Sequence, residues 1–421
     1  MLNLLRNIFS DKSDDFIFRK FDDSYSIAPK DKSGLYIHIP FCKNVCPYCP
    51  YVKVKDDDEL KKQYKNALLS EIKMYNEHFG RIGFSSLYFG GGTPTLMLSD
   101  FAEILECVNK YFTIEGDIAL ETSPDTITPE ILKSLNKLGF NMLSLGIQSL
   151  DGEHLRSIGR KYNRQNALVA IEQTRQWFAG HINADLIFAI RDQTLNDVED
   201  DLSVLVQSKI EQITCYPLFT FPFSEIGKAN HLHKLKLPDP RIRKKMYYFI
   251  NDYLGEIGYE RTNVWSFSKD PDLNYSSVTR NFYLGLGASS GSYNGSTFYF
   301  NTFSVPEYIE KVKKQLPISL AMRVSDRLQK NFWLYWQFYT TSIDKKNFEE
   351  LFDKSLKKDF GFALSLLRFL KFVEYENEYS MKINTRGAHW IHLLQNNYAL
   401  DYVNKIWSAS KKEPWPLEVR L

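Results

Sequence analysis

Three cysteines lie close together near the start of the sequence, in the segment "FCKNVCPYC". Cys42, Cys46 and Cys49 are spaced as Cys-x3-Cys-x2-Cys, directly after the apolar run "GLYIHIP", which is typical of a buried strand. Cysteine thiolates hold iron–sulfur clusters, and a cubane of four irons normally takes four protein ligands. Three thiolates would leave one iron free to bind a small molecule. The spacing therefore predicts a [4Fe-4S] cluster that takes part in chemistry as well as moving electrons.

A zinc site is the alternative for this segment, with His38 as a fourth ligand before the three cysteines. His38 falls inside the expected strand, and the gaps between the cysteines are uneven, so the iron–sulfur interpretation is preferred. Cys107 and Cys215 lie far from the segment. They are expected to be small buried side chains with no chemical role.

A run of three glycines, Gly90, Gly91 and Gly92, follows the second apolar run and leads into Thr93 and Pro94. Glycines let the backbone approach a ligand closely and leave N–H and C=O groups free to bind it. By itself a triple glycine is more typical of a turn than of a site. If the first two strands are neighbours in one parallel sheet, however, this loop lies beside the cysteine loop.

Apolar segments alternate with amphipathic segments through the first half of the chain, which is the pattern of repeated βα units. The expected strands are residues 34–40, 85–91, 117–124, 141–150, 182–190 and 212–219. Glu121, Gln148 and Asp185 interrupt three of these apolar strands near their carboxyl ends. Parallel sheets assemble their sites at that end, so these side chains are expected to gather near the cysteine loop. Periodicity alone leaves open whether the sheet is open or curled into a barrel.

Residues that cap helices mark the ends of the amphipathic segments. Ser99, Thr128 and Asn163 stand where N-caps are expected, and Thr128 precedes a proline. Gly139 is the expected stop of the third helix. These signals support the alternation of strands and helices.

Length and charge bound the class of protein. The chain has 421 residues, of which 43% are hydrophobic and 15% aromatic, enough for one large domain and a smaller one. The 53 basic and 51 acidic residues give a net charge of +2, so neither nucleic acid nor an anionic membrane is the expected partner. No segment has the roughly 18 apolar residues of a membrane span or the pattern of a secretory leader. A small molecule is therefore the expected ligand, and the cytoplasm the expected location.

Five segments together resemble the radical S-adenosylmethionine enzymes: "CKNVCPYC", "GGGTP", "ETSPDTIT", "LGIQSLDGEHLRSIGR" and "NADLIFAIRDQT". More narrowly, they are similar to the oxygen-independent coproporphyrinogen III dehydrogenase family. That family includes the dehydrogenases, related heme chaperones, and relatives that methylate, cyclopropanate or open tetrapyrroles. The resemblance runs from Leu35 to Thr194. It implies an α/β fold, a partial (β/α)6 barrel similar to a TIM barrel, with a small, mostly helical C-terminal domain.

The chain is accordingly expected to divide into four parts. Residues 1–33 form an N-terminal arm, residues 34–237 the partial barrel, and residues 238–323 an extension with a glycine-rich hairpin. Residues 324–421 form a helical domain that is similar to the winged-helix-like domain of the family.

The resemblance also implies which residues bind the cofactors. The three cysteines would ligate the cluster, whose open iron binds the methionine end of S-adenosylmethionine, and Tyr36 joins them among the catalytic residues. The residues implied to hold the first S-adenosylmethionine are Tyr48, on its adenine, with Gly91, Gly92, Thr93 and Glu121. The residues that match a second S-adenosylmethionine site of the dehydrogenases are Tyr36, Gln148, Arg160 and Asp185. One or two molecules of S-adenosylmethionine are therefore expected.

The implied chemistry is reductive cleavage of S-adenosylmethionine, with one electron from a donor such as flavodoxin or ferredoxin. The resulting 5'-deoxyadenosyl radical abstracts a hydrogen from an enclosed substrate, for which the family suggests a tetrapyrrole. The barrel must exclude water and oxygen, because the radical attacks whatever lies nearest. The implied class is an oxidoreductase of porphyrin biosynthesis.

Two departures from the family pattern keep the exact reaction open. The dehydrogenases usually carry a further cysteine two residues after the third ligand, where this chain has Tyr51. The heme chaperones share a histidine-containing motif before the glycine hairpin, where this chain reads "NYSSVTRNFYLGLG". A methyltransferase, a heme-degrading enzyme and a heme chaperone or carrier therefore stay as alternatives. For the carrier, His231 and His233 are the candidate ligands of heme iron.

A basic segment and an aromatic segment lie in the second half of the chain. Arg241, Arg243, Lys244 and Lys245 could meet substrate carboxylates, because guanidinium groups suit them, but a solvated helix face is preferred. The run "NFWLYWQFY" could stack on a flat ligand, but core packing is preferred at helical spacing.

Overall fold

Parallel strands form the centre of the molecule. The computed structural model describes residues 16–232, 237–272 and 281–421. Its central strands, in spatial order, are β2 (Ser33–Ile39), β5 (Ile82–Gly91), β7 (Ile118–Thr122), β8 (Met142–Gln148), β9 (His181–Phe188) and β10 (Gln212–Pro217). Each pairs in parallel with the next. These strands fall on the six expected segments, because their alternation with amphipathic helices is legible in the sequence.

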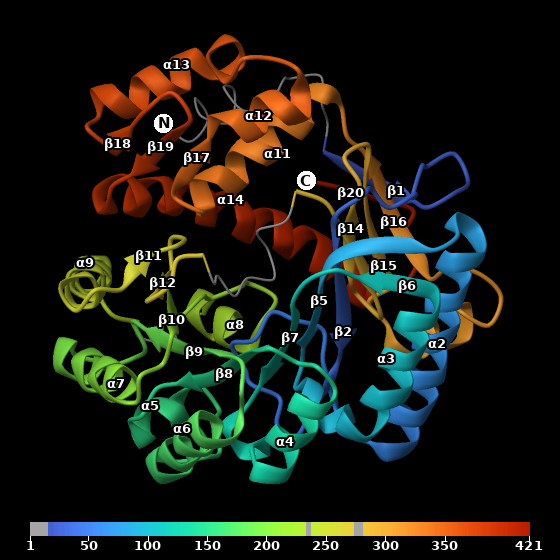
Figure 1. Ribbon diagram of the computed structural model, residues 1–421, viewed down its shortest axis with the longest axis horizontal. Helices are drawn as coiled ribbons and strands as arrows, with labels where there is room; N and C mark the ends of the chain where they lie inside the picture. Colours follow the sequence, from blue (N-terminus) through green and yellow to red (C-terminus); the bar gives the residue numbers. More distant parts are fainter. Residues whose placement is uncertain (1–15, 233–236, 273–280) are drawn as a thin grey trace.

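Helices cover the outer side of these strands. The connecting helices are α2 (Asp58–Phe79), α3 (Phe101–Tyr111), α4 (Pro129–Lys137), α5 (Gly152–Ser157), α6 (Arg164–Trp177) and α7 (Leu195–Gln207). Figure 1 shows the strands following an arc with these helices outside it. β10 pairs onward with β12 (Ser266–Ser268) and then β11 (Glu260–Arg261), while β2 pairs with β13 (Tyr283–Leu286), so the arc does not close on itself. The predicted partial barrel with parallel βα units is confirmed.

Most of the predicted helix ends agree with the structure. The side chains of Thr128 and Asn163 accept backbone N–H bonds at the starts of α4 and α6, and Gly139 has φ +85° just after α4. The Ser99 prediction is wrong, because Ser99 lies inside a 3₁₀ turn, η1 (Pro94–Asp100), that continues directly into α3. The N–H of Phe101 donates to the carbonyl of Leu98 within that turn, so no capping side chain is needed there.

Antiparallel strands extend the sheet beyond β13. They are β14 (Gly291–Tyr293), β15 (Thr297–Asn301), β16 (Ile318–Arg323), β1 (Ile17–Lys20) and β20 (Glu418–Arg420), while the short β6 (Phe112–Ile114) pairs with β5. β1 lies in the segment that the sequence analysis treats as an arm. It pairs with both β16 and β20, so both ends of the described chain belong to the same sheet.

A buried carboxylate fastens this extension to the barrel. Glu71 on α2 accepts hydrogen bonds from the Tyr308 hydroxyl on α10 (Val305–Lys311), the Gly287 N–H and the Asn301 amide, at 2.6–2.8 Å. Burial raises the pKa of Glu71 to about 7. The Tyr308 hydroxyl and the Gly287 N–H would lose their acceptor without Glu71, whereas the Asn301 amide also donates to the Gly287 carbonyl and the Ser290 hydroxyl. This network is therefore a structural anchor rather than a candidate site.

The C-terminal part is mostly helical, as predicted. Its elements are α11 (Asp326–Tyr339), β17 (Ser342–Asp344), α12 (Lys345–Phe352), α13 (Leu356–Phe369), β18 (Val373–Glu376), β19 (Ser380–Ile383) and α14 (Thr385–Lys412). The three strands form a separate sheet in the order β17, β19, β18. Trp333, Leu334 and Phe348 are buried in a core of its own, so much of the aromatic run packs as expected. Figure 1 shows α14 running between this part and the barrel.

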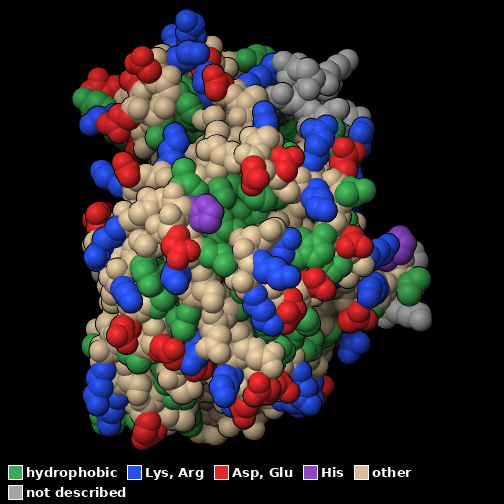
Figure 2. Space-filling model, turned by 90° about the vertical axis from the view of Figure 1, so that its right-hand side faces the viewer, with side chains coloured by type: hydrophobic (Ala, Val, Ile, Leu, Met, Phe, Trp, Pro, Cys, Tyr) green, Lys and Arg blue, Asp and Glu red, His purple; other side chains and the backbone are tan. Residues whose placement is uncertain are grey.

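The surface carries charges of both signs. On the face drawn in Figure 2, Lys and Arg side chains are interspersed with Asp and Glu, which agrees with the net charge of +2. Within the described residues, none of the helices has the length and apolar character needed to cross a membrane.

Candidate active site

The cysteine loop follows β2 at its carboxyl end. β3 (Phe41–Cys42) pairs with β4 (Val54–Lys55) and closes the loop that carries the three thiols. Cys42 and Cys46 are buried and Cys49 is half-buried, and all are free cysteines. Burial, and next the neighbouring Cys49, raises the pKa of Cys42 to about 12, and burial also raises the pKa of Cys46. Thiols in such surroundings ionise readily only when a cation is bound, which fits a metal centre.

The donor set fits an iron–sulfur cluster better than a single ion. A cubane binds its thiolates at separate irons, so its ligands need not converge on one point. His38, the fourth ligand of the zinc alternative, is already engaged. Its Nδ1 is 3.0 Å from the Tyr36 hydroxyl and its Nε2 is 2.9 Å from the Val52 carbonyl.

The glycine loop lies directly against the cysteine loop, as predicted from the strand order. The Gly92 N–H donates to the Ile39 carbonyl at 2.7 Å, and the Thr93 N–H donates to the Phe41 carbonyl at 2.8 Å. Gly91 has φ +111°, and a Cβ there would lie 2.4 Å from the His38 ring. The Thr93 hydroxyl hydrogen-bonds to Cys42 and lowers its pKa. Glycine is therefore required where the two loops touch.

Glu121 at the end of β7 supports the glycine loop. It accepts hydrogen bonds from the Tyr88 hydroxyl at 2.8 Å and from the Gly91 N–H at 3.2 Å. Burial raises the pKa of Glu121 to about 7. The Tyr36 and Tyr88 rings stack with their centroids 6.0 Å apart, so β2, β5 and β7 present one continuous polar and aromatic surface.

Arg160 joins the cysteine loop to the strands opposite. Its guanidinium donates to the Tyr48 hydroxyl at 2.8 Å and to the Ser123 hydroxyl at 3.4 Å, while its Nε is buried without a partner. A small recess of about 20 Å³ beside the loop is lined by Cys46, Thr93, Ser123 and Arg160 among others. This recess places a guanidinium, a hydroxyl and a thiol together.

Gln148 and Asp185 lie at the carboxyl ends of β8 and β9. Gln148 has φ +66° and accepts a hydrogen bond from the Tyr216 hydroxyl at 3.0 Å. Asp185 accepts from the Ser144 hydroxyl at 2.8 Å and from the Asn183 amide at 2.9 Å. Burial raises the pKa of Asp185 to about 6, whereas the Arg160 charge lowers it. The structure thus gathers every residue that the sequence analysis singles out for cofactor binding at one end of the barrel.

Comparison with known proteins agrees with this arrangement. The model of the radical SAM superfamily matches residues 36–205, which hold the cysteine loop, the glycine loop and these strand ends. Residues 36–205 are thus similar to the radical SAM superfamily. The relatives of the chain include proteins named for the heme chaperone HemW and for coproporphyrinogen III oxidation.

The relatives of the chain carry two kinds of name. It is 27% identical to the heme chaperone HemW of Bacillus subtilis, over 76% of this chain and 87% of the relative. It is 28% identical to the oxygen-independent coproporphyrinogen III oxidase of Bradyrhizobium diazoefficiens, over 66% of each chain. The structure of coproporphyrinogen III oxidase (HemN) from Escherichia coli has the same fold, with a TM-score of 0.77 and 22% identity over 94% of this chain and 99% of that one.

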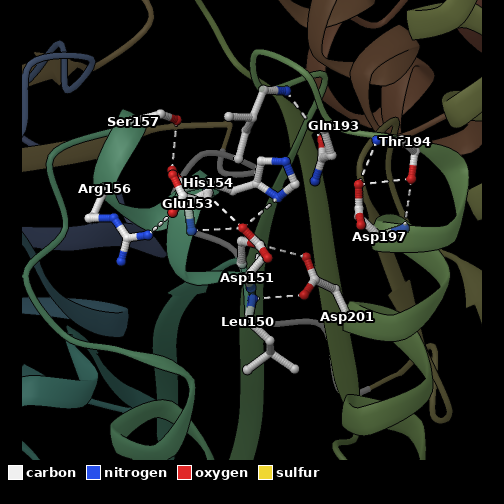
Figure 3. Close-up of polar contacts among 12 residues, drawn as sticks. Leu150, Asp151, Glu153, His154, Arg156, Ser157, Gln193, Thr194, Asp197 and Asp201 are labelled. Atoms are coloured by element: carbon white, nitrogen blue, oxygen red, sulfur yellow. Dashed lines mark hydrogen bonds and ion pairs between the residues drawn. The ribbon is translucent and has the colours of Figure 1, made fainter.

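A second layer of contacts holds the segment between Gln148 and Arg160 in the radical SAM domain. Figure 3 shows Asp201 on α7 pointing toward Leu150. One carboxylate oxygen of Asp201 accepts a hydrogen bond from the Leu150 N–H at 2.7 Å, and the other accepts one from the Ser149 hydroxyl at 3.0 Å. Asp151 caps α5 and lies 3.4 Å from the buried His154 ring. Asp201 is 3% exposed, and burial raises its pKa to about 7. Its contacts fix the chain immediately after Gln148.

Asp201→Asn is expected to remove part of the pH dependence of stability. The folded protein binds this proton more tightly than the unfolded chain, whose pKa is near 3.8, so the contribution of Asp201 is fully present below that pH and is lost as the pH rises through 7. From pH 5 to 8 the wild type should lose on the order of 2–3 kcal/mol relative to Asp201→Asn. Urea unfolding of both proteins at the two pH values measures this. Asp200→Asn, at the exposed neighbouring position, is the control. Equal pH dependence of stability in wild type and Asp201→Asn would contradict the raised pKa of Asp201.

Four tyrosines at the site are not singled out by the sequence analysis. Tyr88 and Tyr216 face the same side of the sheet as the predicted residues, at alternate positions that the strand period makes recognisable. Tyr51 is 48% exposed, whereas burial and then the nearby Asp185 raise the pKa of Tyr339, which comes from α11. Only the tertiary packing brings α11 to the barrel mouth.

The remaining residues considered from sequence are placed as follows. Cys215 is buried in β10, and Cys107 is half-buried on α3, as expected for side chains without a role. His231 ends α8 (Glu225–His231) and is exposed, whereas His233 lies outside the described residues, as does the first half of "NYSSVTRNFYLGLG". Arg241, Lys244 and Lys245 are exposed on α9 (Pro240–Glu256), but Arg243 is not, which corrects the expectation of a wholly solvated face.

Proposed function

We propose that this protein is a radical SAM enzyme that acts on a tetrapyrrole at the carboxyl end of the barrel. The observation that carries the proposal is the junction of the two loops beside Glu121. There the N–H groups of Gly92 and Thr93 donate to backbone carbonyls of the segment that leads to Cys42, and the Thr93 hydroxyl hydrogen-bonds to Cys42. Cys42, Cys46 and Cys49 would hold a [4Fe-4S] cluster, and the glycine loop beside it would hold S-adenosylmethionine. When bound, these groups supply reductive cleavage of the sulfonium bond and a 5'-deoxyadenosyl radical that abstracts a substrate hydrogen.

The chain's own residues would bind and shield the reactants. Tyr48 and Arg160 close the side of the cysteine loop, and their 2.8 Å hydrogen bond fixes the ring that would pack on adenine. Tyr36, Gln148, Arg160 and Asp185 are proposed to bind a second S-adenosylmethionine or part of the substrate. Tyr339 of the C-terminal part covers the mouth near Asp185, which helps to exclude water.

The names of the relatives support a tetrapyrrole as the ligand, but they point to more than one activity. The Bradyrhizobium relative is named for coproporphyrinogen oxidation, so we favour a hydrogen abstraction of that kind. Tyr51 at the position of a dehydrogenase cysteine leaves methyl transfer and ring opening of heme as alternatives. A small electron carrier such as flavodoxin or ferredoxin is the proposed reductant.

The test uses anaerobic, reconstituted protein with S-adenosylmethionine and a chemical reductant, with and without coproporphyrinogen III or heme. Mass spectrometry measures 5'-deoxyadenosine, S-adenosylhomocysteine and the tetrapyrrole. We expect 5'-deoxyadenosine together with a changed tetrapyrrole mass, and the mass difference identifies decarboxylation, methylation or ring opening. If 5'-deoxyadenosine forms but the tetrapyrroles are unchanged, the proposed substrate is wrong. If no 5'-deoxyadenosine forms, the proposed radical SAM activity is wrong.

A heme carrier is the second candidate, because the Bacillus relative is named a heme chaperone. This function predicts a heme Soret band after incubation with hemin, weakened in His231→Ala or His233→Ala. The exposed position of His231 leaves it accessible to such a ligand. A protein that shows no Soret band would exclude the carrier.

A further inference from the structure

Arg243 is a partly buried cation without an anionic partner. It lies in the first turn of α9, and its Nη2 is buried with no hydrogen-bond partner. Burial lowers the pKa of Arg243, with no carboxylate to offset the effect. Arg261 nearby shows the contrast, because its guanidinium donates to Asn251, Thr385 and the Ile383 carbonyl. A desolvated charge without a partner is costly, so its position calls for an explanation.

A second unsatisfied donor site faces the same region from α14. His392 is 7% exposed, and its Nε2 is buried without a partner. The pKa of His392 is lowered to about 3, first by burial and then by the Arg243 charge, which places the two side chains near each other. Arg243 and Lys244 likewise lower the pKa of His389, one turn earlier on α14. The groups that α9 and α14 bring together here are Arg243, Lys244, His389 and His392, none of them acidic.

This cluster lies one aromatic layer from the candidate active site. The His392 ring packs edge-on against Trp265, with centroids 4.1 Å apart. Trp265 in turn contacts Phe188, the last residue of β9, at 6.0 Å and Phe219, just beyond β10, at 6.2 Å. β9 also carries Asp185. Trp265 therefore lies between the His392 ring and the ends of β9 and β10.

Among the side chains that the structure describes, none is a counter-charge for Arg243: it takes part in no ion pair, and its Nη2 has no hydrogen-bond partner. A carboxylate from a ligand would satisfy both the guanidinium, which binds carboxylates through paired N–H donors, and the His392 ring.

We infer that Arg243 and His392 form a subsite for a carboxylate of the substrate, between α9 and α14 and beyond the mouth of the barrel. The inference rests on the proposed function and deepens it, because it requires the substrate to be an acid large enough to span from the barrel to α14. A tetrapyrrole with propionate side chains meets both conditions. A neutral macrocycle would leave Arg243 unpaired.

Binding of coproporphyrin III and of its tetramethyl ester to the anaerobic, cluster-loaded protein tests the inference. Porphyrin fluorescence gives the Kd for wild type, Arg243→Gln and the control Arg241→Gln, an exposed arginine on the same helix. We expect Arg243→Gln to weaken binding of the acid about 10-fold or more, as for loss of a charge-assisted pair, and Arg241→Gln to change it less than 2-fold. The ester should bind wild type and Arg243→Gln equally and weakly.

Further variants separate the subsite from a folding role. His392→Gln should weaken binding of coproporphyrin III less than Arg243→Gln does. Arg243→Lys should bind it more tightly than Arg243→Gln, because lysine keeps the positive charge. Retained cluster absorbance and circular dichroism show that each variant is folded. Equal Kd values for wild type and Arg243→Gln, or no binding to wild type, would overturn the inference. Cleavage of S-adenosylmethionine by the same wild-type preparation tests the proposed function separately.

Discussion

Cys46→Ala is expected to abolish both the visible absorbance of the cluster and the cleavage of S-adenosylmethionine. Cys46 is buried in the loop between β3 and β4, and the Arg160 charge lowers its pKa against the larger opposite effect of burial. It is thus a thiol poised to ionise only when a metal is bound. Two thiolates rarely retain a cubane, so iron and acid-labile sulfide should fall to near background after reconstitution.

The matched control for this prediction is Cys107→Ala. Cys107 is a half-buried thiol on α3, away from the loop, and it makes a weak hydrogen bond to the Leu69 carbonyl at 3.9 Å. It should keep the full iron content and the full rate of 5'-deoxyadenosine formation. If Cys46→Ala kept its cluster and activity, the assignment of the ligands would be wrong.

Gly92→Ala is expected to disrupt the site by separating its two loops. A Cβ at Gly92 would lie 2.4 Å from the Phe41 carbonyl oxygen and 2.9 Å from the Ile39 carbonyl oxygen, whereas ordinary contact begins at 3.4 Å. Both oxygens belong to the backbone, so the cysteine loop or the glycine loop must shift by roughly 1 Å. A displacement of that size in a catalytic arrangement can cost on the order of 10²-fold in rate. Overpacking of this kind also costs about 1–3 kcal/mol of stability.

The measurements for this variant are the affinity for S-adenosylmethionine, by calorimetry on the cluster-loaded protein, and the rate of 5'-deoxyadenosine formation. We expect at least a tenfold loss in each. Gly255→Ala is the control, because a Cβ at Gly255 on α9 meets nothing within 4 Å and alanine favours a helix. Wild-type affinity and rate in Gly92→Ala would show that the contact between the loops does not position the cofactor.

The two predictions test different parts of one arrangement. Cys46 concerns the atoms that would hold iron, whereas Gly92 concerns the backbone that sets the distance between the iron site and the loop for S-adenosylmethionine. Glu121 connects them to β7 through the Gly91 N–H. Loss of the cluster in the first variant and of cofactor affinity in the second would therefore be expected as separate defects.

The surroundings of Arg243 illustrate how the C-terminal part contributes to the function that we propose. α14 places His392 against Trp265, and α11 places Tyr339 near Asp185, so two helices of this part reach the barrel mouth. The fold shared with the Escherichia coli enzyme extends over 94% of the chain, so this part is included in the likeness. We propose that it completes the substrate site.

The sequence by itself determined the local features of the protein. The six parallel strands, the caps at Thr128 and Asn163, and the contact between the cysteine and glycine loops follow from periodicity, residue type and the order of the strands. These features depend on neighbours in the chain or on adjacent parallel strands, which sequence patterns describe well. The Ser99 cap failed because a 3₁₀ turn and a helix run together without a visible signal.

Only the tertiary structure decided the features that depend on distant packing. Arg243 has the same residue type and local setting as the exposed Arg241, yet α14 covers it, and no periodicity in α9 shows this. The pairing of Tyr48 with Arg160 and the approach of Tyr339 to Asp185 likewise join segments far apart in the chain. Burial and charge pairing across such distances are set by how the elements pack, and for that reason residue type alone does not reveal them.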